Sequence, residues 1–153
     1  MNIRFYHAKI LMTDENKKFS ILNGELWVEN DSISYIGDGK ELRNQKEDAV
    51  IFDREIDVEG NLLMPGFKDA HTHTAMTFLR SYADDLPLQE WLEKQVFPNE
   101  AKLTKEDVYY LAILGIMEYL TSGITSNFDM YNFPRSIAKA SKDTGFRTVF
   151  CSG

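Results

Sequence analysis

The sequence predicts an α/β chain with a small β-sandwich domain in residues 1–63, followed in residues 64–153 by strands and helices in the order β-α-β-α-β. Two patterns support this fold class. In the first section apolar and polar residues alternate with a period of two, which is typical of strands with one buried face. In the second section short apolar runs alternate with helical patterns, which favours a parallel sheet in a doubly wound fold or a (β/α) barrel.

The size of the second section limits its architecture. A complete (β/α)₈ barrel takes about 250 residues, whereas residues 64–153 supply three strands and two main helices. These elements cannot close a barrel. The sequence therefore predicts either an open three-stranded sheet or the front part of an incomplete TIM (β/α)₈ barrel.

The first section begins with strand and hairpin signals. The stretch IRFYHAKIL (residues 3–11) is the first candidate strand. The stretch GELWVENDSISYIG (residues 24–37) predicts a β-hairpin, because two alternating segments flank the turn-forming pair Asn30 and Asp31.

A polar loop with room for one helical turn is predicted in GDGKELRNQKEDA (residues 37–49). Alternation resumes in VIFDREIDVEGNLLMPG (residues 50–66), which returns to strands. The mostly apolar LLMPGFKDAHTH (residues 62–73) has the pattern of a strand buried on both faces. Pro65 and Gly66 argue against a helix there.

Two helices are predicted next. LQEWLEKQVF (residues 88–97) is a short one that Pro98 should end. LTKEDVYYLAILGIMEYLTSG (residues 103–123) carries the strongest helical signal, with Thr104 suited to the N-terminal cap and Gly123 to the C-terminal end. Its apolar stripe consists of Val108, Leu111, Ala112, Gly115, Ile116, Tyr119 and Leu120.

The remaining residues predict strand, helix and strand. ITSNFDMY (residues 124–131) has the composition of a strand. FPRSIAKASKDTG (residues 133–145) is typical of a helix, with Pro134 in its first turn and Gly145 after its end. FRTVFCSG (residues 146–153) begins a third parallel strand.

Composition narrows the class of protein. The net charge of −7 and the pI of about 4.9 argue against a general binder of nucleic acids or anionic membranes. The single cysteine, Cys151, fits a reducing compartment. No signal peptide and no apolar run of about 20 residues, the length of a membrane span, is evident. We therefore expect a soluble cytoplasmic protein.

His71 and His73 are the candidate metal ligands. On a strand, residues two apart share a face, so both imidazoles can reach one cation, and imidazole is a preferred zinc ligand. They stand at the C-terminal end of the first parallel strand, where (β/α) folds place their active sites. The alternative is that both histidines only bond to neighbouring backbone.

The chain also resembles a known family. LLMPGFKDAHTHTAMTFLRSYADDLPLQEWL is similar to the first barrel strand and following loop of the amidohydrolase superfamily, metal hydrolases with a (β/α)₈ barrel. GELWVENDSISYIG resembles the strands of the β-sandwich that precedes the barrel in many members. The motifs H-T-H-x-x-M-T-x-L-R, D-L-P-L-x-E-W-L and F-D-M-Y resemble most closely the methylthioadenosine/S-adenosylhomocysteine deaminases and their chlorohydrolase relatives.

This resemblance implies roles for particular residues. It makes His71 and His73 the first two ligands of a single zinc or iron ion. It assigns Glu100 to the ribose hydroxyls of a purine nucleoside, and Trp91 to an aromatic wall near that nucleoside. The alternatives are a solvated loop carboxylate and an apolar contact of the short helix. Asp129 and Tyr131 would have supporting roles at the end of the second strand.

The resemblance is incomplete, because no histidine follows His73. The family's later metal ligands and its general acid/base have no counterpart, so no catalytic residue is assigned within this chain. We expect the N-terminal portion of an enzyme that deaminates an adenosine-type nucleoside with metal-activated water, inactive in isolation, and forming a homo-oligomer or pairing with the missing remainder.

Two alternatives stay open. One is another amidohydrolase reaction, such as that of a chlorohydrolase or of a guanine or cytosine deaminase. The other is a non-catalytic interaction fragment that pairs its exposed strand edges with another chain.

Overall fold

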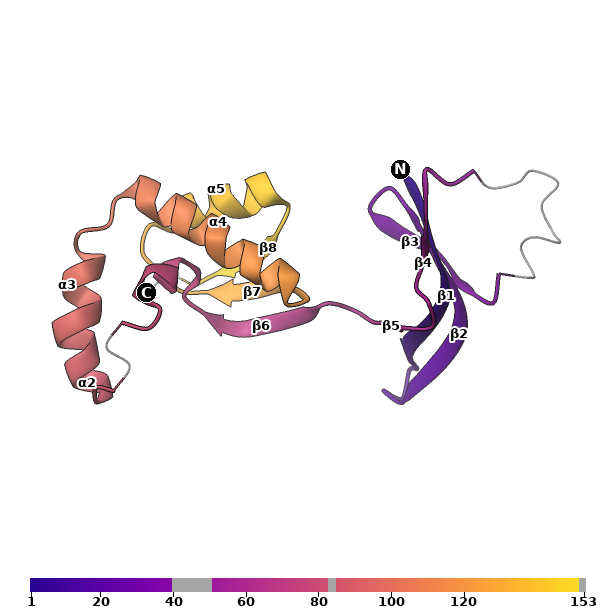
Figure 1. Cartoon of the computed structure of the whole chain (residues 1–153), viewed down its shortest axis with the longest axis horizontal. Coiled ribbons are helices and arrows are strands. Elements are labelled where there is room, and N and C mark those ends of the chain that lie inside the picture. The colour runs from indigo at the N-terminus through magenta and orange to yellow at the C-terminus, as the bar shows by residue number, and fades with distance from the viewer. Residues whose placement is uncertain (40–50, 83–84, 152–153) are drawn as a thin grey trace. The chain divides into compact units, whose positions relative to one another are not determined.

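The computed structural model describes residues 1–39, 51–82 and 85–151, and it divides into two compact units, Met1–Pro65 and Gly66–Gly153 (Figure 1). The polar loop predicted for residues 37–49 lies outside the described residues beyond Gly39. The two units are treated separately below.

The first unit is a five-stranded sheet. Its strands are β1 (Asn2–Thr13), β2 (Phe19–Glu29), β3 (Ser32–Gly37), β4 (Arg54–Asp57) and β5 (Leu62–Leu63). The strand order is β3-β2-β1-β4, with β5 also paired to β1. The described residues 1–39 and 51–65 contribute all five strands to this one sheet.

The predicted hairpin is confirmed. Strands β2 and β3 pair in antiparallel fashion, and Glu29 opposes Ser32 across the turn. Asn30 adopts a φ of 57°, a left-handed conformation that asparagine tolerates well. The alternation of apolar and polar residues was therefore a sufficient signal for these strands.

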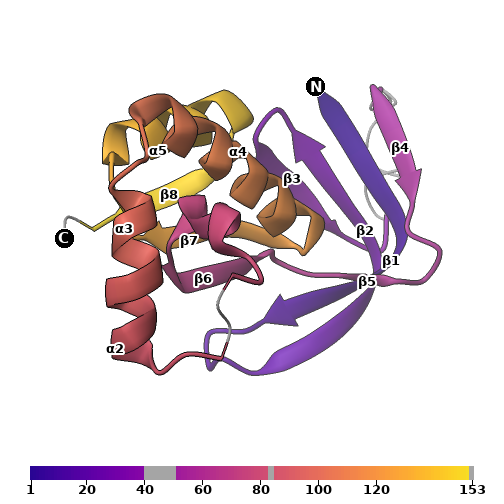
Figure 2. The ribbon, with the colours of Figure 1, turned by 60° about the vertical axis from the view of Figure 1, so that its left-hand side comes forward.

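The second unit is a three-stranded parallel sheet with helices on one face (Figure 2). The strands, in spatial order, are β6 (Phe67–Thr72), β7 (Ile124–Asp129) and β8 (Arg147–Phe150). Helices α4 (Lys105–Thr121) and α5 (Pro134–Thr144) cover the sheet. The buried core consists of Ala75, Val108, Ala112, Ile116, Ile137, Ala140 and Phe146. The predicted alternation of strands and helices is confirmed.

The strand predicted within residues 62–73 is wrong in its extent and its burial. Leu62 and Leu63 belong to β5 of the first unit, and β6 begins only at Phe67. Pro65 and Gly66 separate the two strands, because proline cannot donate to a sheet ladder. The helices cover only one face of the sheet, so Phe67 is 58% exposed rather than buried.

The helix predicted to stop at Pro98 continues through it. α2 (Leu88–Trp91), the π-helical segment η2 (Leu92–Val96) and α3 (Phe97–Glu100) follow one another without interruption. The Phe97 N–H donates to the carbonyl of Leu92, five residues back. This wider turn lets the helix accept a proline ring that would clash in a regular α-helix. The side chain of Asn99 donates to the Gln95 carbonyl at 2.7 Å.

Helix α4 has the predicted caps. Thr104 and Asp107 form a capping box, in which each side chain bonds the other residue's backbone N–H. Ser122 ends the helix, and Gly123 follows it with a φ of 79°. Helix α5 likewise has Pro134 at its start and Gly145, with a φ of 73°, at its end.

Candidate functional site

The two candidate metal ligands lie side by side at the end of β6. The ring centroids of His71 and His73 are 5.2 Å apart, and the ring planes meet at 82°. His71 is exposed and His73 is half-buried. This is the shared face that strand geometry predicts for residues two apart.

An irregularity in the sheet lies next to this pair. Asp69 pairs with Asn127 and Thr72 pairs with Asp129, so β6 advances by three residues while β7 advances by two. The extra residue is a bulge around His71. Bulges redirect side chains and are common beside active sites. Sequence reasoning missed this bulge, because no glycine or proline marks it.

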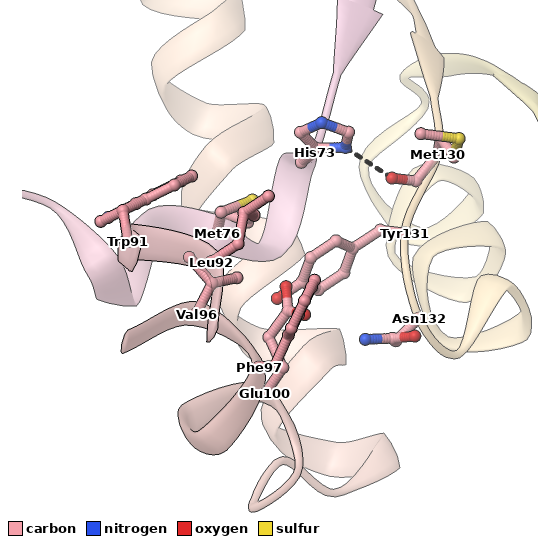
Figure 3. A pocket seen from close by; sticks show the side chains of 10 residues that line it. All are labelled: His73, Met76, Trp91, Leu92, Val96, Phe97, Glu100, Met130, Tyr131 and Asn132. Carbon is pink, nitrogen blue, oxygen red and sulfur yellow. Dashed lines mark hydrogen bonds between the residues drawn. The ribbon is translucent and has the colours of Figure 1, made fainter. Parts of the chain in front are cut away.

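The ring of His73 has a defined tautomer. Its Nδ1 lies 2.6 Å from the carbonyl oxygen of Met130 (Figure 3). A carbonyl can only accept a hydrogen bond, so Nδ1 carries the hydrogen, and in the neutral ring Nε2 then holds the lone pair. Metal-binding histidines generally donate their second nitrogen in this way. Sequence reasoning missed this contact of Met130, since a backbone carbonyl has no residue-specific signal.

Asp129 supports the same segment from β7. Its side chain is buried, and its Oδ2 accepts the backbone N–H of Thr74 at 3.2 Å. Burial raises the pKa of Asp129, and its hydrogen bonds with Thr74 oppose that rise. Its Oδ1 has no hydrogen-bond partner among the residues that the structure describes.

A cavity of about 400 Å³ opens beside His73 (Figure 3). Its wall consists of His73, Met76, Trp91, Leu92, Val96, Phe97, Glu100, Met130, Tyr131 and Asn132. The helix formed by α2, η2 and α3 supplies half of these residues, and segments following β6 and β7 supply the others. His73, Trp91, Glu100 and Tyr131 are thus brought together, whereas His71 does not line the cavity.

Glu100 and Tyr131 are two of the polar residues that line this mostly apolar cavity (Figure 3). Burial raises the pKa of the Tyr131 hydroxyl, and the nearby Glu100 carboxylate raises it further. Tyr131 therefore remains protonated at neutral pH. Its buried hydroxyl has no hydrogen-bond partner among the residues that the structure describes. The Glu100 carboxylate is nevertheless close enough to raise the pKa of this hydroxyl. A ligand in the cavity could form hydrogen bonds with both groups.

A complete metal centre is not formed by the described residues. No group of three or more histidine, cysteine, aspartate or glutamate side chains is close enough to hold an ion within residues 1–39, 51–82 and 85–151. In that same part of the chain, no helix is both long and apolar enough to cross a membrane.

Curated relatives match all or most of the chain. It is 44% identical over 153 residues to the 5-methylthioadenosine/S-adenosylhomocysteine deaminase of Caldicellulosiruptor saccharolyticus, covering 100% of this chain and 34% of that protein. It is also 44% identical over 131 residues to the 5'-deoxyadenosine deaminase of Methanosarcina acetivorans, covering 86% of this chain and 28% of that protein. The chain therefore spans about a third of the length of the first of these relatives.

Solved structures share the fold. An adenosine deaminase from Xanthomonas campestris with bound zinc matches with a TM-score of 0.81 and 29% identity, over 97% of this chain and 32% of that one. The zinc complex of the atrazine chlorohydrolase TrzN from Arthrobacter aurescens TC1 matches with a TM-score of 0.78 over 98% of this chain and 35% of that one. Its sequence identity is 17%, so this match supports the fold alone. The amidohydrolase family matches residues 62–153. With that match covering most of its length, this chain belongs to the amidohydrolase family.

Proposed function

We propose that the chain is the N-terminal portion of a metal-dependent aminohydrolase that deaminates an adenosine-type nucleoside, such as methylthioadenosine or S-adenosylhomocysteine. The arrangement around His73 carries the proposal, because a histidine with a fixed tautomer stands beside a second histidine and a cavity that contains Glu100. The names of the relatives at 44% identity support the choice of substrate.

The domain organisation that we propose follows from the same comparisons. Residues 1–63 would belong to the β-sandwich domain, and residues 64–153 would contribute the first β-α-β-α-β elements of a (β/α)₈ barrel. The parallel order β6-β7-β8 supports this assignment. It places His71 and His73 at the C-terminal end of the first barrel strand, the end where such barrels carry out chemistry.

His71 and His73 would hold one divalent ion, zinc or iron. Their geometry fits this role, since the rings are neighbours and the Met130 carbonyl leaves Nε2 of His73 available. A catalytic zinc site usually has three protein ligands, so further ligands would come from outside the described residues. When bound, such an ion supplies a water nucleophile that is active at neutral pH.

The cavity would bind the nucleoside. The Glu100 carboxylate can accept hydrogen bonds from both ribose hydroxyls, and Trp91 can pack against the flat purine. A ribose-binding role for Glu100 favours a nucleoside over a triazine or a free base, neither of which has hydroxyls for it to bind.

The first test measures bound metal and deamination in the full-length protein and in three histidine variants. We expect His71→Ala and His73→Ala to lose both the metal and the deamination of methylthioadenosine. His7→Ala is the matched control, because His7 is exposed in the first unit and contacts Asp57. Equal metal content in all variants would contradict the assignment of the ligands.

The second test concerns the ribose. With Glu100→Gln we expect kcat/KM for the nucleoside to fall about 10- to 100-fold, the range for losing hydrogen bonds to a charged group. The 2′,3′-dideoxy analogue should be a poor substrate for the wild type and lose nothing further in the variant. Glu93→Gln, on the same helix but outside the cavity lining, is the control. An equal loss for both substrates would refute the ribose role.

A further inference from the structure

A buried polar network brackets the histidine pair, and Asn127 of β7 is at its centre. The side-chain amide of Asn127 donates to Oγ1 of Thr72 at 2.9 Å and to Oγ1 of Thr74 at 2.8 Å. Thr72 separates the two histidines, and Thr74 follows the second. All three network residues are at most 5% exposed.

The hydrogen-bond directions in this network are fixed by its other members. The hydroxyl of Thr72 donates to the carbonyl of Phe128 at 3.1 Å, so it can only accept from Asn127. The hydroxyl of Tyr119, on α4, donates to Oγ1 of Thr74 at 3.3 Å. These bonds orient the Asn127 amide with Nδ2 toward both threonines.

The same orientation leaves Oδ1 of Asn127 buried, without a partner in the described part of the chain. Buried polar groups are normally satisfied, so an unpaired one needs an explanation. An apolar residue of similar shape would avoid this unpaired acceptor. What the amide contributes at this position is the pair of hydrogen bonds that Nδ2 donates to Thr72 and Thr74.

The backbone ladder supplies only part of this positioning, through the pairing of Thr72 with Asp129. Regular pairing between β6 and β7 is interrupted from Asp69 to Thr72, which is the stretch that contains His71. Side chains must therefore fix the backbone on both sides of His73. Among these side chains, Asn127 bonds both Thr72 and Thr74 through its one amide group.

We infer that Asn127 is a positioning residue for the metal site: it acts through Thr72 and Thr74 to hold His71 and His73 in the orientation that binds the ion. The inference rests on the proposed function, since it concerns the same metal. Asn127 itself touches neither the ion nor the substrate.

The test is zinc affinity, measured by competition with a chromophoric chelator, in the full-length protein. We expect Asn127→Ala to weaken zinc binding about 10- to 100-fold, the range for removing residues that orient metal ligands. Ser141→Ala is the matched control, since it removes another poorly accessible hydrogen bond of this unit, the one between the hydroxyls of Ser141 and Thr148. It should leave zinc affinity unchanged.

A triple variant covers the case in which Asn127→Ala does not fold. Asn127→Leu, Thr72→Val and Thr74→Val together replace the network by apolar groups of similar shape, a change that can be nearly neutral for stability. We expect its melting temperature to stay close to that of the wild type while its zinc affinity falls. In the metal-free protein, NMR of isotope-labelled histidine should show that His73 loses its single tautomer.

The outcomes separate the two proposals. If the wild type binds no zinc, the proposed metal site fails and this inference fails with it. If the wild type binds zinc and the triple variant binds it equally well, with an unchanged His73 tautomer, the inference about Asn127 is overturned and the proposed function stands.

Discussion

Replacing Gly115 by alanine should destabilise the second unit although Gly115 lies in the middle of a helix. A Cβ at this position would lie 2.6 Å from the carbonyl oxygen of Thr74 and 2.9 Å from its Cγ2, closer than real Cβ atoms come to other atoms. Alanine gains about 1 kcal/mol over glycine in helix propensity. Overpacking a close contact costs about 1–3 kcal/mol, and a backbone carbonyl cannot rotate away.

At the upper part of the overpacking range, the cost exceeds the gain in helix propensity. The free energy of unfolding should therefore fall by about 1–2 kcal/mol. This corresponds to a fall in Tm of about 2–8 °C for a protein of this size, measurable by circular dichroism. Because Thr74 follows His73, zinc affinity should fall as well.

A second substitution tests the cause of this effect. Thr74→Ser removes Cγ2 but leaves the nearer carbonyl oxygen in place, so it should not rescue Gly115→Ala. A Tm for Gly115→Ala at or above that of the wild type would refute the reasoning. It would mean that α4 moves away from the segment after His73 at negligible cost.

Two further predictions concern helix α4. Thr104→Ala should lower the free energy of unfolding by about 1 kcal/mol, because it removes the capping box with Asp107. Thr104→Ser should keep most of that stability, and thermal unfolding would measure both effects. Equal losses in both variants would argue against capping. The ion pair with Arg80 lowers the pKa of Glu118 from its ordinary value of 4.5. A lowered pKa stabilises the fold above that value, so the Tm advantage of the wild type over Glu118→Gln should disappear as the pH falls through the lowered pKa. Adding Glu118→Gln to Arg80→Gln should change nothing further, and a pH-independent difference would contradict the assignment.

The sequence predicted those parts of the fold that neighbouring residues determine. The capping role of Thr104 depends on Asp107, three residues away, and the ends of α5 depend on Pro134 and Gly145. The hairpin at Asn30 depends on turn chemistry and on alternation to either side. Each signal lies within one element, so it could be recognised without knowledge of the tertiary fold.

The errors in the prediction arose where a local rule met a non-local arrangement. Pro98 does not end its helix, because the π-helical turn before it makes room for the ring. The apolar run of residues 62–73 contributes strands to two different sheets, so its composition does not correspond to a single strand. Pro65, which lies between the two strands, is the residue that marks the boundary.

The candidate site divides in the same way. His71, His73, Glu100 and Trp91 were found because their side-chain chemistry, or a family motif, pointed to them. Asn127 was not found, although it is buried beside the pair. Its role depends on which strand lies next to β6, and the sequence alone does not give that register.

The neighbouring strand therefore determines the geometry of the proposed metal site as much as the strand that carries the ligands. Every residue from Asn127 to Met130 bonds the segment from Thr72 to Thr74. The side chain of Asn127 bonds the two threonine hydroxyls, and that of Asp129 accepts from the Thr74 N–H. The carbonyls of Phe128 and Met130 accept from Thr72 and His73. The Met130 N–H also donates to the Thr72 carbonyl at 3.1 Å. A substitution on β7 that touches no metal should thus alter metal binding more than one at an exposed position of β6 other than His71, because β7 and Met130, which follows it, make these bonds to the segment around His73.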